Sequence, residues 1–200
     1  MVRRGLLGGT FDPPHLGHLV LAEAARRILD LDEVIFIPAG QPWVKAAMKV
    51  TPARHRLAMT RLAAADVPYA GVSDIEIKRP GPSYTWQTLE ELRRLYPKDE
   101  LYFILGWDNL ISLPSWHHPD RIIKSACLAA APRIGSPRPD LNALDKAVPG
   151  LAARTVVMTE PEIDISATSI RERVRRDQAI SALVAAPVAA YIADHGLYRD

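Results

Sequence analysis

Residues 5–18 read Gly-Leu-Leu-Gly-Gly-Thr-Phe-Asp-Pro-Pro-His-Leu-Gly-His. The first three form a short apolar run that indicates a strand, and the glycines and threonine that follow let backbone N–H groups approach an anion closely. His15 and His18 are three residues apart where a helix begins, so both rings lie on one face of its first turn. The positive end of the helix dipole adds its field there. This stretch therefore predicts a polyphosphate site at a strand-to-helix junction, with two imidazoles facing it.

Apolar runs and helical periodicity predict strands that alternate with helices along the rest of the chain. The first predicted strand ends at residues 6–7. The others cover residues 34–37, 70–77 (one or two short strands), 101–105, 126–131 and 155–158. The predicted helices cover 19–29, 52–65, 85–95, 168–177 and 187–194, with loops at 39–51 and 132–150. This order implies an α/β fold, a parallel sheet covered by helices on both faces. Ligands of such sheets bind at the carboxyl ends of the strands, where residues 8–9, 38–40 and 106–108 can converge.

Size and composition fit a single domain over residues 1–200, with a small helical C-terminal part at about 160–200. The net charge of +2 does not indicate a nucleic-acid partner. No apolar run reaches the roughly 18 residues of a membrane span. The single cysteine, Cys127, excludes an intramolecular disulfide framework and is compatible with a cytoplasmic protein.

A second candidate anion site is residues 165–171, Ile-Ser-Ala-Thr-Ser-Ile-Arg. We expect Thr168 at the N-cap of a helix, and with Ser169 and Arg171 it makes a helix start that receives an anion. The alternative is plain helix capping with Arg171 in solvent. For the histidine pair the alternatives are helix capping or zinc ligation, but a zinc site needs a further ligand at suitable spacing, and none is evident.

Two further segments suggest what the second ligand is. Residues 79–85, Arg-Pro-Gly-Pro-Ser-Tyr-Thr, precede a predicted helix whose first N–H groups can hold a small carboxylate. Residues 113–116, Leu-Pro-Ser-Trp, place Trp116 on a loop, where its face can stack on a planar heterocycle. A structural turn and an ordinary packed or exposed aromatic are the respective alternatives.

The first block resembles the H/T-x-G-H signature of the nucleotidylyltransferase superfamily, which has a Rossmann-like fold. Residues 165–171 resemble its I-S-x-T-x-x-R box. The chain also resembles bacterial nicotinate mononucleotide adenylyltransferases, in order and over nearly its whole length, at residues 81–89, 105–108, 114–116 and 191–198. Many of those relatives have P-P-H-K where this chain has Gln41-Pro42-Trp43-Val44-Lys45, so the lysine is retained and the histidine is lost.

The resemblance implies transfer of AMP from ATP to nicotinate mononucleotide, which yields nicotinate adenine dinucleotide and pyrophosphate in NAD biosynthesis. The implied catalytic residues are His15, His18, Lys45 and Arg171. The implied ATP-binding residues are Gly8, Gly9, Thr10, Phe11, Gly17, Gly106, Asp108, Ser166 and Thr168, with Asp108 at the ribose. The implied nicotinate mononucleotide residues are Thr85 and Trp116 at the pyridine ring and its carboxylate and Arg133, with Lys45, at the phosphate.

The resemblance further implies Mg²⁺ bound through the ATP phosphates, no protein metal site, and a homodimer as one assembly state. Other enzymes of this type stay open, with nicotinamide mononucleotide or phosphopantetheine as the acceptor. Residues 81–85 and 114–116 argue against phosphopantetheine. A non-catalytic adenine-nucleotide sensor is the alternative from another class, and the intact His15, His18, Lys45 and Arg171 argue against it.

Overall fold

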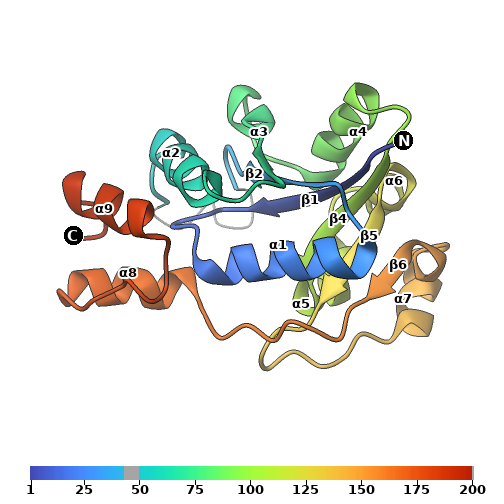
Figure 1. The fold of residues 1–200 in the computed structure, drawn as a ribbon. Helices are drawn as coiled ribbons and strands as arrows, with labels where there is room; N and C mark the ends of the chain where they lie inside the picture. Colours follow the sequence, from blue (N-terminus) through green and yellow to red (C-terminus); the bar gives the residue numbers. More distant parts are fainter. Residues whose placement is uncertain (43–49, 200) are drawn as a thin grey trace.

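A six-stranded parallel sheet forms the centre of the protein, in a computed structural model that describes residues 1–42 and 50–199. The strand order is β3-β2-β1-β4-β5-β6, and every neighbouring pair is parallel (Figure 1). The strands are β1 (Arg3–Gly9), β2 (Glu33–Pro38), β3 (Ala70–Val72), β4 (Glu100–Gly106), β5 (Cys127–Ala131) and β6 (Thr155–Val157). The expected α/β architecture with a parallel sheet is therefore confirmed.

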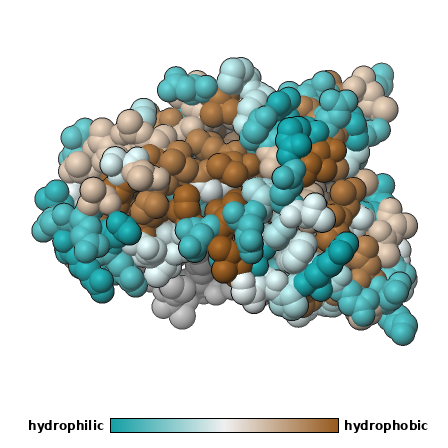
Figure 2. Space-filling view, turned by 60° about the horizontal axis from the view of Figure 1, so that its bottom comes forward, coloured by the Kyte–Doolittle hydropathy of each residue, from teal (hydrophilic) through white to brown (hydrophobic). Residues whose placement is uncertain are grey.

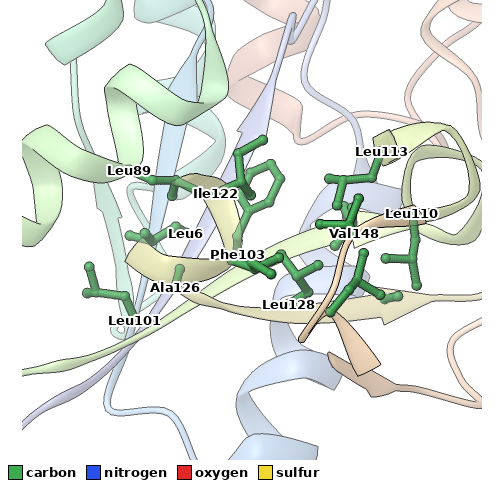
Figure 3. Close-up of a cluster of buried hydrophobic side chains, with 14 of the residues drawn as sticks. Leu6, Leu89, Leu101, Phe103, Leu110, Leu113, Ile122, Ala126, Leu128 and Val148 are labelled. Carbon is green, nitrogen blue, oxygen red and sulfur yellow. The ribbon is translucent and has the colours of Figure 1, made fainter. Parts of the chain in front are cut away.

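Helices cover both faces of this sheet, because alternate strand residues point to opposite sides. They are α1 (Leu16–Leu29), α2 (Ala53–Ala64), α3 (Ile75–Lys78), α4 (Thr85–Leu95), α5 (Trp107–Ser112), α6 (Pro119–Ser125), α7 (Leu141–Ala147), α8 (Ala167–Arg175) and α9 (Ala186–Asp194), with 3-10 turns η2 (Leu113–Ser115) and η3 (Ala152–Arg154). Leu6 belongs to a buried apolar cluster that includes side chains of α4, α5 and α6 (Figure 3), whereas Leu7 belongs to a cluster that includes side chains of α1. Each face of the sheet thus has its own apolar core.

Three predictions of local structure were wrong or incomplete. Residues 75–77, predicted as strand, belong to α3, because β3 pairs with β2 over three residues only and the chain then leaves the sheet edge. Residues 132–150, predicted as loop, contain α7, whose N-cap Asp140 accepts hydrogen bonds from the amides of Asn142 and Ala143. Helices α5 and α6 were not predicted, since each spans only seven residues or fewer and neither shows a long apolar periodicity.

The chain reverses its direction of winding between β1 and β4. From β1 it builds outward through β2 to β3, and it then returns to place β4 on the other side of β1. Ligands of open parallel sheets bind at such a switch point, outside the carboxyl ends of the strands. Gly9 ends β1 and Gly106 ends β4, so the glycine-rich block lies beside this crevice.

The C-terminal helices pack against α2 rather than on the main sheet (Figure 1). Ile170 of α8 and Val188 of α9 are buried with Met59 of α2 in a third apolar cluster. The amide of Leu16, the first residue of α1, donates to the carbonyl oxygen of Leu183 (2.8 Å). The segment between α8 and α9 is therefore attached to the start of α1. None of the helices in the described ranges has the length and apolar character that a membrane span requires.

Candidate active site

A cavity of about 530 Å³ lies at the carboxyl ends of the strands. Most of the residues implied by the family resemblance line it, from both motifs and from the substrate segments. They are Gly8, Gly9, Thr10, Phe11, His15, Gly17, His18, Thr85, Gly106, Trp116, Arg133, Ser166, Thr168 and Arg171. Lys45 lies outside the described residues.

The two histidines form a stacked pair at the start of α1. Their ring centroids are 3.7 Å apart, with an angle of 29° between the ring planes. The backbone N–H of His15, the N-cap residue, donates to Nδ1 of His18 (3.1 Å). Nδ1 of His18 is therefore an acceptor, so a neutral His18 carries its proton on Nε2. Phe11 holds the same ring edge-on, with a centroid separation of 4.8 Å.

His15 is neutral near pH 7. Burial of its ring, and secondly the positive charge of Arg133, lower its pKa to about 4. Its Nδ1 is buried and has no hydrogen-bond partner among the described residues. It points at the backbone of the first turn of α1, in the geometry of a capping box with His18.

Gly17 allows a close approach between segments that are distant in sequence. A side chain at this position would place its Cβ 2.6 Å from Cγ2 of Ile163, which belongs to the segment that leads to α8. The family resemblance implies that Gly17 binds ATP, and Gly17 lines the cavity. Its close contact with Ile163 also brings the segment before the second motif against α1.

The second motif reaches the first through Arg171. Its Nη1 donates to the backbone carbonyl oxygen of Asp12 (2.8 Å), and its Nη2 lies 3.2 Å from Oγ1 of Thr168. The predicted N-cap of this helix was wrong: Ser166, not Thr168, is the N-cap, and its Oγ accepts from the amide of Ser169 (3.1 Å). Thr168 lies in the first turn instead. The charged residues of α8 that face solvent contribute to the hydrophilic left end of Figure 2.

Asp108 and Arg133, which the resemblance assigns to different ligands, form an ion pair at the edge of the cavity (3.2 Å). Asp108 is not among the cavity residues. Its carboxylate turns back over Gly106 and lines a shallower groove beside the cavity. Oδ1 of Asp108 is buried and has no hydrogen-bond partner in the described part of the chain. The cavity and this groove therefore share Arg133.

Thr85 and Trp116 line the same cavity. Thr85 is the first residue of α4, and Nε1 of Trp116 donates to Oγ of Ser112 (3.2 Å). Beside them is the buried carboxylate of Glu76, which accepts a hydrogen bond from Oγ1 of Thr88 (2.8 Å). Burial raises the pKa of Glu76.

Sequence reasoning assigned no individual role to three buried polar residues around the cavity: Arg56, Glu76 and Ser83. Arg56 is 1% exposed and donates to the carbonyl oxygens of Thr10 (2.9 Å), Gly40 (3.0 Å) and Thr51 (2.8 Å). Oγ of Ser83 accepts from the amide of Gly40 (3.0 Å). The one sequence signal for Arg56 was its place on the core-facing side of an amphipathic helix, and this place does not identify the partners of its guanidinium.

Known proteins similar to this chain carry closely related names. A family model described as cytidylyltransferase-like matches residues 6–173. A protein of Dehalococcoides mccartyi (strain CBDB1), named "Probable nicotinate-nucleotide adenylyltransferase", is 52% identical over 198 residues, which cover 98% of this chain and 97% of that protein. A protein of Thermus thermophilus with the same name is 43% identical over 198 residues, 99% of this chain and 100% of its own.

One similar solved structure is "Plasmodium falciparum nicotinic acid mononucleotide adenylyltransferase complexed with NaAD". Its TM-score is 0.81 at 18% sequence identity, and the alignment covers 99% of this chain and 98% of that chain. At this level of identity the likeness concerns the fold, and it extends to the C-terminal helices.

The lowered pKa of His15 makes folding stability depend on pH. Between about pH 6.5, the usual histidine value, and about pH 4, the unfolded chain binds this proton and the folded chain does not, so acid favours unfolding. We expect His15→Gln to remove this dependence. Between pH 7.5 and pH 5 the unfolding free energy of the variant should fall less than that of the wild type, by on the order of 2 kcal/mol in urea titrations. Equal losses in the two proteins would contradict the assignment.

Proposed function

The chain belongs to the cytidylyltransferase-like family, and we propose that its cavity transfers AMP from ATP to nicotinate mononucleotide, a step of NAD biosynthesis. The products are nicotinate adenine dinucleotide and pyrophosphate. The observation that carries the proposal is that one cavity joins both phosphate motifs to residues 85 and 116 of the substrate segments. Its full-length similarity to relatives named nicotinate-nucleotide adenylyltransferase supports the choice of acceptor.

The two phosphate motifs bracket the proposed position of the ATP triphosphate. The positive end of the α1 dipole favours phosphate oxygens, although the amides of Leu16 and His18 already donate to the carbonyl oxygens of Leu183 and His15. The Nε2–H of His18 adds a donor, and Arg171 adds a full positive charge from the other side. The buried imidazole of His15 lines the same region of the cavity.

In the proposed reaction, a phosphate oxygen of nicotinate mononucleotide attacks the α-phosphorus of ATP in line. The new P–O bond forms as the bond between the α-phosphorus and the bridging oxygen breaks, and pyrophosphate leaves with that electron pair. The protein supplies positioning and charge stabilisation, which are the main contributions in phosphoryl-type transfers. A protein nucleophile has no part in this scheme.

The acceptor is proposed to bind with its pyridine ring near Trp116 and its carboxylate at the start of α4. Thr85 is the first residue of that helix, where the first amides and the helix dipole favour an anion. We assign Arg133 and Lys45 to the phosphate of the mononucleotide and Asp108 to the ATP ribose. With this assignment, the two substrates meet at one shared charge pair, because Asp108 and Arg133 form an ion pair.

We propose that Mg²⁺ enters as the complex of ATP and is held mainly by phosphate oxygens. Asp12, a carboxylate on the cavity wall, is already hydrogen bonded to the amide of Thr51 (3.1 Å) and the hydroxyl of Tyr198 (2.7 Å), which fits this arrangement. We further propose that residues 1–200 act as one domain in the cytoplasm. The homodimer implied by the resemblance stays a prediction.

The direct test is pyrophosphate release from ATP and Mg²⁺ with three separate acceptors: nicotinate mononucleotide, nicotinamide mononucleotide and phosphopantetheine. We expect the highest kcat/KM with the first, because its carboxylate matches the anion-receptive start of α4. Equal use of both pyridine nucleotides would remove the role of the Thr85 region in selecting the acid. ATP binding without release in the presence of any acceptor would contradict the proposed activity and favour a nucleotide sensor.

His18→Ala should lower kcat about 100-fold or more while changing the KM values little, because removal of one donor to transition-state charge costs about that factor. His195→Ala is the matched control, since His195 is an exposed ring stacked on Tyr191, and it should keep the wild-type kcat. Circular dichroism establishes that both variants are folded. Turnover of His18→Ala close to that of the control would exclude a catalytic role for His18.

A further inference from the structure

Asp12 joins three parts of the chain beneath the cavity. Its side chain is 5% exposed, and Oδ1 accepts a hydrogen bond from the hydroxyl of Tyr198 (2.7 Å) while Oδ2 accepts from the amide of Thr51 (3.1 Å). Its backbone carbonyl oxygen accepts from Nη1 of Arg171 (2.8 Å). The first motif therefore holds, at one residue, both the arginine of the second motif and a tyrosine 186 positions later in the sequence.

Tyr198 is a permanent hydrogen-bond donor. Burial, and secondly the charge of the adjacent Asp12, raise the pKa of its phenol well above the usual range, so the hydroxyl keeps its proton throughout the pH range of enzyme assays. The residue that it contacts lines the cavity, but Tyr198 itself is not among the cavity residues. Of the residues that its hydroxyl contacts, Asp12 lines the cavity, so we take Asp12 as the route by which Tyr198 influences the proposed substrates.

Tyr198 also belongs to the packing of the C-terminal helices. Its side chain lies against the apolar cluster that contains Ile170 of α8 and Ile192 of α9. Arg171 directly follows Ile170. The hydrogen bond from Tyr198 to Asp12 and the hydrogen bond from Arg171 to the same residue thus close a ring that connects α8, the cluster and the loop of the first motif.

From this ring we infer that Tyr198 is a positioning residue for the reaction: by fixing Asp12, it sets the place of Arg171 relative to His15 and His18. The inference rests on the proposed function for the identity of the ligand, ATP. Loss of the hydroxyl leaves a buried carboxylate oxygen without its donor, so the Asp12 loop relaxes and the guanidinium loses its fixed acceptor. We therefore expect weaker binding of ATP, which Arg171 faces in the proposed complex, and unchanged binding of the acceptor at the Thr85 end of the cavity.

The test compares Tyr198→Phe with Tyr191→Phe. Tyr191 is the matched control because it also packs on the C-terminal cluster and its hydroxyl also forms a side-chain hydrogen bond, to Nδ1 of His55 (3.0 Å). We expect Tyr198→Phe to raise the KM for ATP, and the Kd for ATP measured by calorimetry, about three- to tenfold. The KM for nicotinate mononucleotide should stay near that of the wild type, and Tyr191→Phe should change neither constant.

A double-mutant cycle with Arg171→Ala separates positioning from general destabilisation. If Tyr198 acts through Arg171, Tyr198→Phe has almost no further effect on the Kd for ATP once Arg171 is removed. If Tyr198→Phe raises the Kd for ATP by the same factor with Arg171 present and with Arg171→Ala, the inference is overturned. It is also overturned if Tyr198→Phe lowers the thermal midpoint but leaves the KM and Kd for ATP unchanged. If Tyr198→Phe does not fold, Asp12→Asn serves as the second variant and should show the same selective loss for ATP.

Different results would contradict the proposed function and the positioning role of Tyr198. Absence of product in the wild type with every acceptor would contradict the proposed function, yet the Kd comparison for ATP would still decide the role of Tyr198. Normal turnover in the wild type with unchanged ATP constants in Tyr198→Phe would contradict the positioning role alone.

Discussion

The position of β4 beside β1 determines where this protein can bind a ligand. Because the sheet grows outward in two directions from this pair, the loops after β1 and β4 separate and leave a crevice between them. The glycine-rich block after β1 and the start of α5 after β4 border that crevice. The cavity follows from this topology, and the side chains determine what it can hold.

Buried polar contacts hold the loops around the cavity in place. Arg56 binds three carbonyl oxygens from three segments, and Asp12 accepts hydrogen bonds from Thr51, Tyr198 and Arg171. Groups of this kind are costly to bury without partners, and loss of one partner of a buried ion or hydrogen-bonded charge is strongly destabilising. The loops are therefore restrained before any ligand arrives, which is a condition for catalysis by positioning and electrostatics.

Much of the fold could be predicted from the sequence because the signals are local. Each central strand is a run of apolar residues that ends at a glycine or proline, and the two phosphate motifs lie at the starts of helices. The N-cap of α8 was misplaced by two residues because Ser166 and Thr168 are equally good cap residues, and only the backbone conformation distinguishes them. Helix α7 was missed because a proline-rich segment precedes its short apolar pattern.

The remaining parts of the site depend on contacts across long stretches of sequence. Arg56, Glu76 and Tyr198 acquire their partners only when the helices have packed, so neither their spacing nor their residue type reveals a role. Family resemblance could identify the residues of the cavity, but it could not show which of them, such as Asp108 and Arg133, already bind one another.

In the proposed complex, the triphosphate of ATP lies between the start of α1 and Arg171. The most direct measurement is a crystal structure with a non-hydrolysable ATP analogue and Mg²⁺. We expect phosphate oxygens within hydrogen-bond distance of His18 Nε2 and of the Arg171 guanidinium, with the ribose toward Asp108. Phosphates bound instead in the shallower groove lined by Ile134 and Pro137, and distant from both His18 and Arg171, would contradict it.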